Sequence, residues 1–368
     1  MVEKDCEKIY SLGYSFIMLS SFFAVFLGIG SYLMFKYTRN DTYLICIIGA
    51  LISTAIFYII RYIVNNNDYD DIYELNKGIF GKFLGRILNI ILLLGFILIA
   101  SIILFNNANF FNAEYLPDTS INFLKAIILL PLVYISSKSL ASIIKMNQVL
   151  CIINIFMLFL SIIGVFAEFD ITNLEPVFNA SYGEIFKSIV LYVVLSIVPL
   201  SMLLVCSRKR IADSERLNGN LLKSFVFTNI LQFLIVLITI LVLGEKFISL
   251  FRFPEHIALK QFNLFNIFQR VENFLALQFY FSSFSLMSFL FYYIIKAMPS
   301  TKFRNYYSIL ISIFLYFFTN IIFNNTVIFT EMIDKYIIYV ILITIFTPIL
   351  ATFAKLIMQN KFAKIDKK

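Results

Sequence analysis

The chain has 368 residues, of which 60% are hydrophobic and 14% are charged, and it carries a formal net charge of +8. Soluble domains usually have about a quarter charged residues, so this composition excludes a protein whose whole surface faces water. Residues 1–10 are mixed in charge and run directly into an apolar stretch, so no cleavable signal segment is expected.

Ten apolar runs follow one another along the chain, and each is roughly long enough to cross a bilayer. Lipid offers no partners to backbone N–H and C=O groups, so such runs are expected to be helices. They do not alternate polar and apolar residues as membrane β-strands do. The sequence therefore predicts an all-α polytopic membrane protein with spans over residues 10–35, 42–63, 84–105, 120–136, 149–168, 182–206, 221–244, 271–295, 305–323 and 334–357.

Basic residues are distributed unevenly among the gaps between these runs. If the gaps alternate between the two sides of the membrane, 21 of the 30 Lys and Arg residues fall on the side of the chain ends and 9 on the other side. Cytoplasmic loops carry the excess of Lys and Arg in membrane proteins. Both termini are therefore predicted in the cytoplasm. The positive charge indicates contact with anionic lipid, and no nucleic-acid motif is present.

Three of the gaps contain more than a simple loop. Residues 64–83 are polar and lead into a glycine-containing turn at 78–85 on the inner side. Residues 106–119 form an outer segment without basic residues. Residues 245–270 form a longer outer insert, in which the apolar positions after Pro254 predict a short amphipathic helix at the membrane surface. His256 lies in this insert and is expected to be a surface histidine.

The first span contains the motif FLGIGSYLM at residues 26–34. Each glycine weakens a helix interior by about 1 kcal/mol relative to alanine. In many transporters, a helix interrupted near the middle of the membrane exposes backbone groups that bind ligands. The alternative is close packing of helices through small residues, which is common in membranes. The candidates for ligand binding in this motif are Leu27, Gly28, Ile29, Gly30 and Ser31.

The sixth span contains a second possible interruption in YVVLSIVPLSML at residues 192–203. Pro199 has no N–H and leaves the carbonyl near Leu195 without its helical donor, and Ser196 or Ser201 is placed to bond to it. Taken alone, the motif favours a tolerated kink. The first and sixth spans are corresponding positions in a transporter that repeats five helices in inverted order, so two interruptions there predict a binding site at the midplane.

Motifs for catalysis are missing from the sequence. It contains no nucleotide-binding loop, zinc-protease helix motif or nucleophile elbow, and a single histidine cannot supply a multi-histidine metal site. The sequence therefore predicts neither an enzyme nor a bound metal or cofactor. No chain of acidic residues runs through the spans as in proton-driven carriers.

Five stretches carry a family resemblance: LGIGSYL (27–33), IYELNKGIFGKFLGRILNIILLLGF (72–96), YLPDTSINFLKAIILLPLVYISSKSLASIIKMNQVL (115–150), FDITNLEPVF (169–178) and FPEHIALKQFNLFNIFQRVENFLAL (253–277). In this order they are similar to the B subunit of bacterial endospore germinant receptors. These subunits are the endospore germination permeases of the amino acid–polyamine–organocation superfamily. In the last stretch, Arg270, Val271 and Glu272 match an Arg–apolar–Glu element of the family.

The resemblance covers nearly all of the chain and implies a five-plus-five inverted-repeat fold. It implies one membrane domain over residues 1–368, with repeats at about 10–168 and 182–357. It also implies a subunit that senses small nutrients, often amino acids, in the inner membrane of a dormant spore. Such a subunit sits beside an A subunit and a lipoprotein C subunit and binds its ligand near the breaks in spans one and six.

The chain departs from the family pattern at both of these spans. Residues 31–35 follow the glycines where the family often has a proline, and residues 194–196 stand where many members carry glycine and an acidic residue. The expected pocket is therefore mostly apolar, and its polar groups are Tyr192, Ser196 and Ser101 of the third span.

Three functions are consistent with the sequence. The leading one is a non-catalytic sensor, in which ligand binding selects one of two packings that partner subunits distinguish. The second is an amino-acid carrier that works by alternating access. The third is a structural membrane subunit that binds no ligand and positions other subunits.

Overall fold

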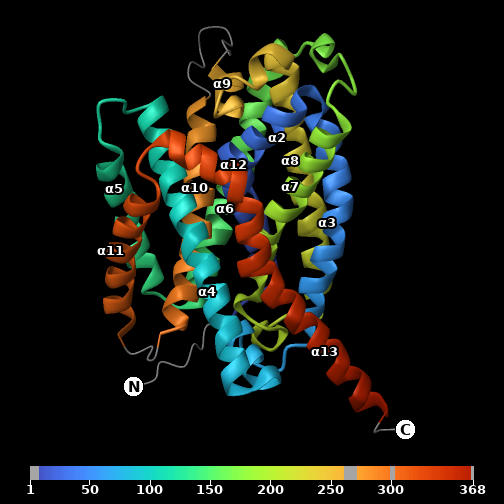
Figure 1. Ribbon diagram of the computed structural model, residues 1–368, viewed down its shortest axis with the longest axis vertical. Coiled ribbons are helices and arrows are strands. Elements are labelled where there is room, and N and C mark those ends of the chain that lie inside the picture. Colours follow the sequence, from blue (N-terminus) through green and yellow to red (C-terminus); the bar gives the residue numbers. More distant parts are fainter. Residues whose placement is uncertain (1–7, 261–271, 299–302, 366–368) are drawn as a thin grey trace.

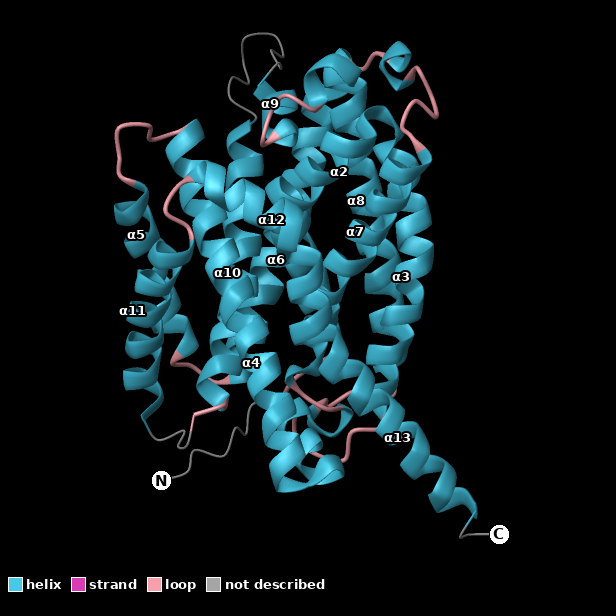
Figure 2. Ribbon diagram, in the orientation of Figure 1, coloured by secondary structure: helices cyan, strands magenta, loops and turns pink. Residues whose placement is uncertain are grey.

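The computed structural model describes residues 8–260, 272–298 and 303–365, and its regular structure is a bundle of helices (Figure 1). Figure 2 shows that the loops gather at the two ends of this bundle. The helices are α1 (Ser11–Val25), α2 (Ser31–Thr38), α3 (Thr42–Asn65), α4 (Ile72–Glu114), α5 (Ile121–Ser136), α6 (Leu140–Val165), α7 (Tyr182–Ser201), α8 (Leu217–Ile248), α9 (Pro254–Lys260), α10 (Glu272–Lys296), α11 (Arg304–Ile322), α12 (Thr326–Ile341) and α13 (Thr347–Ile365). Two π-type turns, η1 (Phe26–Gly30) and η8 (Leu342–Phe346), join α1 to α2 and α12 to α13.

The predicted all-α membrane architecture is confirmed. Eight helical stretches among the described residues are long and apolar enough to cross a membrane. The first, Ser11–Asn65, holds the first two predicted spans, which meet at the turn Arg39–Asp41. A shorter apolar helix, α5, stands at the fourth predicted span. Each of the ten predicted runs therefore coincides with a helix or with two helices joined by a π-type turn.

Burial separates central helices from peripheral ones. In α7 and α10, 83% and 72% of the most apolar stretch is buried, against 28% in α11. α1 packs against α6, α7, α8 and α10, so it is also central. α5 and α11 pack together at one side of the bundle (Figure 1). The first span therefore runs through the most protected part of the molecule.

The start of α1 and the end of α13 lie at the same end of the bundle, which we call the inner end after the predicted topology (Figure 1). There, Ala212 N donates to Ile9 O at 2.9 Å, and Asp213 accepts hydrogen bonds from the backbone N–H and hydroxyl of Ser11 at 2.7 and 2.6 Å. The opposite end, which carries α9 and the turn between α2 and α3, is the outer end. An even number of crossings requires this arrangement, and the assignment of the inner end to the cytoplasm stays a prediction.

The outer insert differs from its prediction. α9 begins at Pro254, but most of its side chains are buried, and the helix packs against α8 and α10. Apolar residues lie on more than one face of this short helix, so it is covered on several sides. His256 is fully buried, with its Nε2 3.0 Å from Tyr115 Oη and its Nδ1 3.3 Å from Glu114 Oε2. Residues 261–271, over which the amphipathic helix was expected to continue, lie outside the described residues.

α4 extends beyond the predicted third span at both ends. At the inner end, Gly81 takes φ 79° and ψ 174°, so the predicted glycine turn is confirmed and residues 72–80 form a separate helical arm. At the outer end, the helix continues to Glu114 and so takes in most of the predicted outer segment 106–119, and Asn106 within it is buried. The predicted third span ended too early, at residue 105, because asparagine prefers turns, whereas packing between neighbouring helices overrides this preference here.

Candidate functional site

The first span is interrupted where its two glycines lie. Leu27 takes φ −66° and ψ 123°, and Gly28 takes φ 83° and ψ −58°, before the helix resumes at Ser31. Residues with a Cβ rarely adopt positive φ, so Gly28 is required at this point. A Cβ on Gly28 would also stand 3.0 Å from Phe253 Cε1. Residues 27–31 are all buried. The predicted break in the first span is therefore confirmed, in the interior of the bundle.

A small cavity adjoins the break, and we call it the break cavity. Its volume is ≈ 10 Å³, which is on the order of one water molecule. Four separate parts of the chain form its wall. They contribute Gly28 and Tyr32 from the first span, Asn106 from α4, Arg252 from the segment before α9, and Thr330 from α12.

Two polar side chains of the break cavity have unused hydrogen-bonding capacity. Asn106 is 1% exposed, and neither its Nδ2 nor its Oδ1 has a partner in the described part of the chain. Arg252 Nη1 also has no partner there, and the guanidinium lies 5.0 Å from the ring centre of Phe329 and 5.7 Å from that of Phe253. Buried polar groups are nearly always paired in proteins. The Asn106 amide and Arg252 Nη1 are exceptions, and a ligand in the break cavity can form hydrogen bonds with them.

The chemistry of these groups favours a small ligand with an anionic end. Glu245 and Glu255 are the described acidic residues closest to Arg252 in the sequence, and neither forms an ion pair with Arg252. Glu245 pairs with Arg39, and Glu255 Oε1 has no partner among the described residues. A guanidinium binds carboxylate or phosphate in preference to other groups. The Asn106 amide can donate and accept hydrogen bonds. The break cavity is therefore suited to a carboxylate next to the interrupted backbone.

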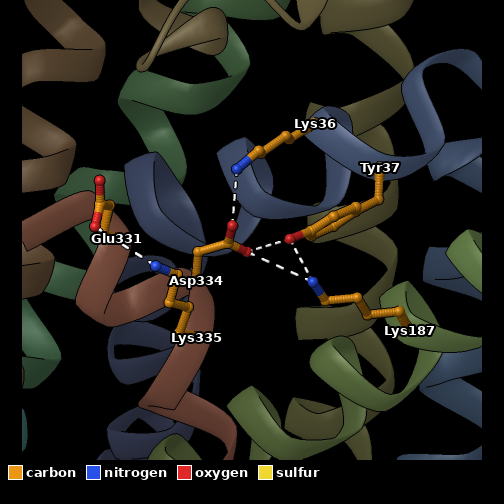
Figure 3. A network of polar contacts seen from close by, with 6 residues as sticks. All are labelled: Lys36, Tyr37, Lys187, Glu331, Asp334 and Lys335. Carbon is orange, nitrogen blue, oxygen red and sulfur yellow. Dashed lines mark hydrogen bonds and ion pairs between the residues drawn. The ribbon is translucent and has the colours of Figure 1, made fainter. Parts of the chain in front are cut away.

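A set of four charged and polar side chains joins three helices at the outer end, and we call it the outer ion cluster. Figure 3 shows Asp334 of α12 facing Lys36 and Tyr37 of α2 and Lys187 of α7. Lys36 Nζ lies 2.8 Å from Asp334 Oδ2, and Lys187 Nζ lies 3.7 Å from Asp334 Oδ1 and 2.5 Å from Tyr37 Oη. The outer ion cluster therefore holds α2 against α12, and both of these helices continue into the wall of the break cavity.

Among the candidates in the third and sixth spans, Leu195 lies close to the first span. It lines an apolar cavity of ≈ 10 Å³ together with residues of the first, third and tenth spans. Ser101 and Ser196 donate to carbonyls of their own helices at 3.0 and 2.6 Å, and Tyr192 donates to Asn229 of α8 at 2.7 Å. The three hydroxyls are engaged within the protein, and their role as ligand contacts stays a prediction.

The expected break at Pro199 is wrong. α7 runs without interruption from Tyr182 to Ser201 and then tightens into a 3₁₀ turn, Met202–Val205. Unwinding of the kind found in the first span needs a residue that accepts positive φ, and α7 has no glycine after Gly183. Pro199 is therefore tolerated within a continuous helix, and the first span alone supplies the broken helix of the two.

Sequence reasoning missed Asn106 and Arg252. Both lie in outer segments between the predicted spans. The available signal for Asn106 was an asparagine run that directly continues an apolar helix, and the signal for Arg252 was a lone cation between aromatic residues in an apolar insert. Arg270 lies outside the described residues, and Glu272 is the first residue of α10, so the role of this pair also stays a prediction.

Comparisons with known proteins agree with this architecture. The model of a family described as spore germination protein matches residues 13–327. Among solved structures, a Na+-coupled sialic acid symporter in a substrate-bound outward-open state aligns with 90% of this chain and 78% of its own, with a TM-score of 0.55 and 13% sequence identity. No curated protein matches the chain in sequence. The structural likeness confirms the predicted five-plus-five transporter fold.

Proposed function

The chain belongs to the family of spore germination proteins, and we propose that it is the nutrient-sensing subunit of a germination receptor in the inner membrane of the spore. In this proposal, a small amino-acid-like nutrient binds at the break in the first span without any chemical step. Its partners are an A-type membrane subunit and a C-type lipoprotein.

The break cavity is the observation that supports this proposal. The carboxylate of a nutrient matches the unpartnered groups of Arg252 and Asn106 beside the interrupted backbone at Gly28. The cavity has room for about one water molecule, so a nutrient has to separate the first span from α12 and from the segment before α9. Nutrient binding then favours the open packing over the closed one, and the partner subunits respond to the difference.

Replacing Asn106 by leucine tests this site in spores that have no redundant receptor. Loss of a hydrogen bond to the ligand weakens binding by about 1–3 kcal/mol. The nutrient concentration for half-maximal germination is therefore expected to rise about tenfold or more in Asn106→Leu spores. Arg252→Gln spores are expected to show a larger rise, because the charge that attracts the carboxylate is removed.

The neighbouring Asn107 provides a matched control. It is equally buried, at 1% exposure, but its Nδ2 donates to Ile103 O of its own helix, and it does not line the break cavity. Asn107→Leu spores are expected to keep the normal nutrient response at normal protein level. A response of Asn106→Leu and Arg252→Gln spores that equals the response of the unmodified strain would remove the site assignment.

An amino-acid carrier is the second candidate, and its support is the likeness in fold to a Na+-coupled symporter. The two functions differ in what the isolated chain does in a sealed vesicle. Concentrative uptake of labelled amino acid by the reconstituted chain, driven by a Na+ or proton gradient, favours the carrier. Saturable binding without uptake favours the sensor.

A further inference from the structure

A further unpartnered group lies near the break, on α9. Glu255 is 3% exposed, and its Oε1 has no hydrogen-bond partner in the described part of the chain. It lines a cavity of ≈ 20 Å³ between α6, α8, α9 and α10, to which Ser161 and Thr239 contribute hydroxyls and the other lining residues are aliphatic. The hydroxyl of Ser31, the first residue of α2, lies beside Glu255, is also buried and makes no well-formed hydrogen bond. The carboxyl therefore lies between α9 and the point where the broken span resumes.

No described cation compensates a negative charge on Glu255. Lys260 and His256 of the same helix both lie against Glu114, and Arg252 lies over aromatic rings. η1 has no charged residue. The described charged residues of the packed helices α6, α8 and α10 stand near helix ends, and they are Lys145, Lys223, Glu245, Lys246, Glu272 and Lys296.

Two properties of the site decide what it binds. An unpaired carboxylate in an apolar interior carries a large desolvation penalty, and a neutral carboxyl avoids this penalty. Burial raises the pKa of Glu255 to about 7. The Ser31 hydroxyl lowers this pKa, but by less than burial raises it. The two hydroxyls that line the cavity, those of Ser161 and Thr239, donate to carbonyls of their own helices, so with one carboxyl the side chains supply few oxygens for a metal ion that takes six or more oxygen ligands.

We propose that Glu255 is an exchangeable proton-binding site that ties α9 to the broken first span. A proton from water binds the carboxylate, and the resulting neutral carboxyl stays buried beside the Ser31 hydroxyl without the penalty of an uncompensated charge. Movement of α9 away from the break hydrates Glu255 and releases the proton. The state with α9 packed is therefore favoured at acidic pH and weakened as pH rises.

The pH dependence of unfolding tests the proton site without any nutrient. The folded-state pKa is raised above its ordinary value of 4.5, so the stabilisation is complete below about pH 4.5 and is lost as pH rises through about 7. Over this range, the folding equilibrium constant of the purified protein is expected to fall by on the order of 100-fold because of Glu255. Melting temperatures of the unmodified protein and of the Glu255→Gln variant are measured in detergent across this pH range. The part of the pH dependence that is missing in the variant is the contribution of Glu255.

The Glu255→Gln variant keeps the shape of the neutral acid and cannot titrate. Its melting temperature is therefore expected to lack the fall with rising pH that Glu255 causes in the unmodified protein. The matched control is the Glu114→Gln variant, which changes a glutamate that contacts the same helix, α9. Its melting temperature is expected to keep the fall with rising pH. Ser31→Ala removes the group that favours the charged form, so it is expected to move the midpoint of the fall to higher pH.

Infrared difference spectra between acidic and alkaline pH provide a second readout on the unmodified protein. The carbonyl stretch of a protonated buried carboxyl is expected to disappear with a midpoint near neutral pH and to be missing in Glu255→Gln. An identical pH dependence of unfolding in unmodified and Glu255→Gln protein would overturn the proposal. Stabilisation of the unmodified protein by Na+ and not by choline at alkaline pH, lost in Glu255→Gln, would also overturn it, because the site would then bind a metal cation.

Discussion

At Gly28, the backbone adopts φ 83° and ψ −58°, a conformation that is rare and strained for residues with a Cβ. Gly28→Ala is therefore expected to destabilise the protein by about 1–3 kcal/mol, and the Phe253 ring, 3.0 Å from the new Cβ, adds to the cost. The control is Gly183→Ala near the start of α7, where nothing lies within 4 Å of a new Cβ. Melting temperatures of the two variants, compared with the unmodified protein, measure the effect.

Gly30 separates the effect of backbone conformation from the effect of helix packing. It has an ordinary helical φ of −66°, and a Cβ there would meet Phe26 Cδ1 at 3.0 Å. Gly30→Ala is therefore expected to cost less than Gly28→Ala, because a side chain can give way more easily than a backbone dihedral. Equal losses in the two variants would support close helix packing as the reason for both glycines.

Single residues of the site differ in how well the sequence predicts them. Gly28 was predictable, because a glycine pair weakens a helix inside an apolar run that otherwise favours one. Asn106 and Arg252 were not, because their importance comes from lacking a partner after the helices have packed. The same holds for Glu255, whose carboxyl is isolated only because α9 turns into the bundle. Lack of a partner is a property of tertiary structure and leaves no mark in a local sequence pattern.

At the scale of helices, the outer ion cluster joins α2, α7 and α12 through Asp334 (Figure 3). Partly exposed ion pairs contribute about 1 kcal/mol or less each, and Asp334 contacts two lysines and a tyrosine. Asp334→Asn is therefore expected to raise the population in which α2 and α12 separate by about fivefold. The measurement is the rate at which a thiol reagent modifies Thr330→Cys in the wall of the break cavity, in a background without native cysteines.

Glu331 and Lys335 supply a control one helical turn away. They form an ion pair at 3.6 Å within α12, with both side chains more than 60% exposed, and they do not join α12 to another helix. Glu331→Gln is expected to leave the modification rate unchanged. If Asp334→Asn leaves it unchanged as well, the outer ion cluster does not control opening of the break cavity.

The sequence predicted the helices themselves well and their irregularities less well. Positions of the spans follow from apolar length, because lipid forces every crossing to satisfy its own backbone. The break at Gly28 and the turn at Gly81 follow from glycine. Pro199 was wrongly expected to interrupt α7, because one missing hydrogen bond is too weak a cause where the other backbone groups of a membrane helix have no partner outside the helix. The π-type turn η8 has no glycine or proline within it, but Pro348 follows two residues later and cannot donate to the carbonyl of Thr344 inside the turn.

At the scale of the whole molecule, the fold and the function are supported by different observations. A symporter with 13% sequence identity shares the fold, because hydropathy and helix packing determine the fold without fixing side-chain chemistry. A function depends on particular side chains, and the unpartnered groups around the break include those of Asn106, Arg252 and Glu255. Variants at these three positions therefore test the function, whereas variants of the lipid-facing surface do not.

Orientation in the membrane is the remaining property of the whole molecule, and the excess of basic residues on one side predicts it. Val177, in the outer loop before α7, and Asn66, in the inner loop after α3, are both exposed. A membrane-impermeant thiol reagent added to intact cells is expected to modify Val177→Cys, and to modify Asn66→Cys only after permeabilisation. The opposite pattern would place the outer ion cluster and α9 in the cytoplasm. A nutrient arriving from outside would then reach the break cavity from the end where Tyr14 and Tyr293 contact carbonyls near the end of α7, so access would depend on those contacts and not on Asp334.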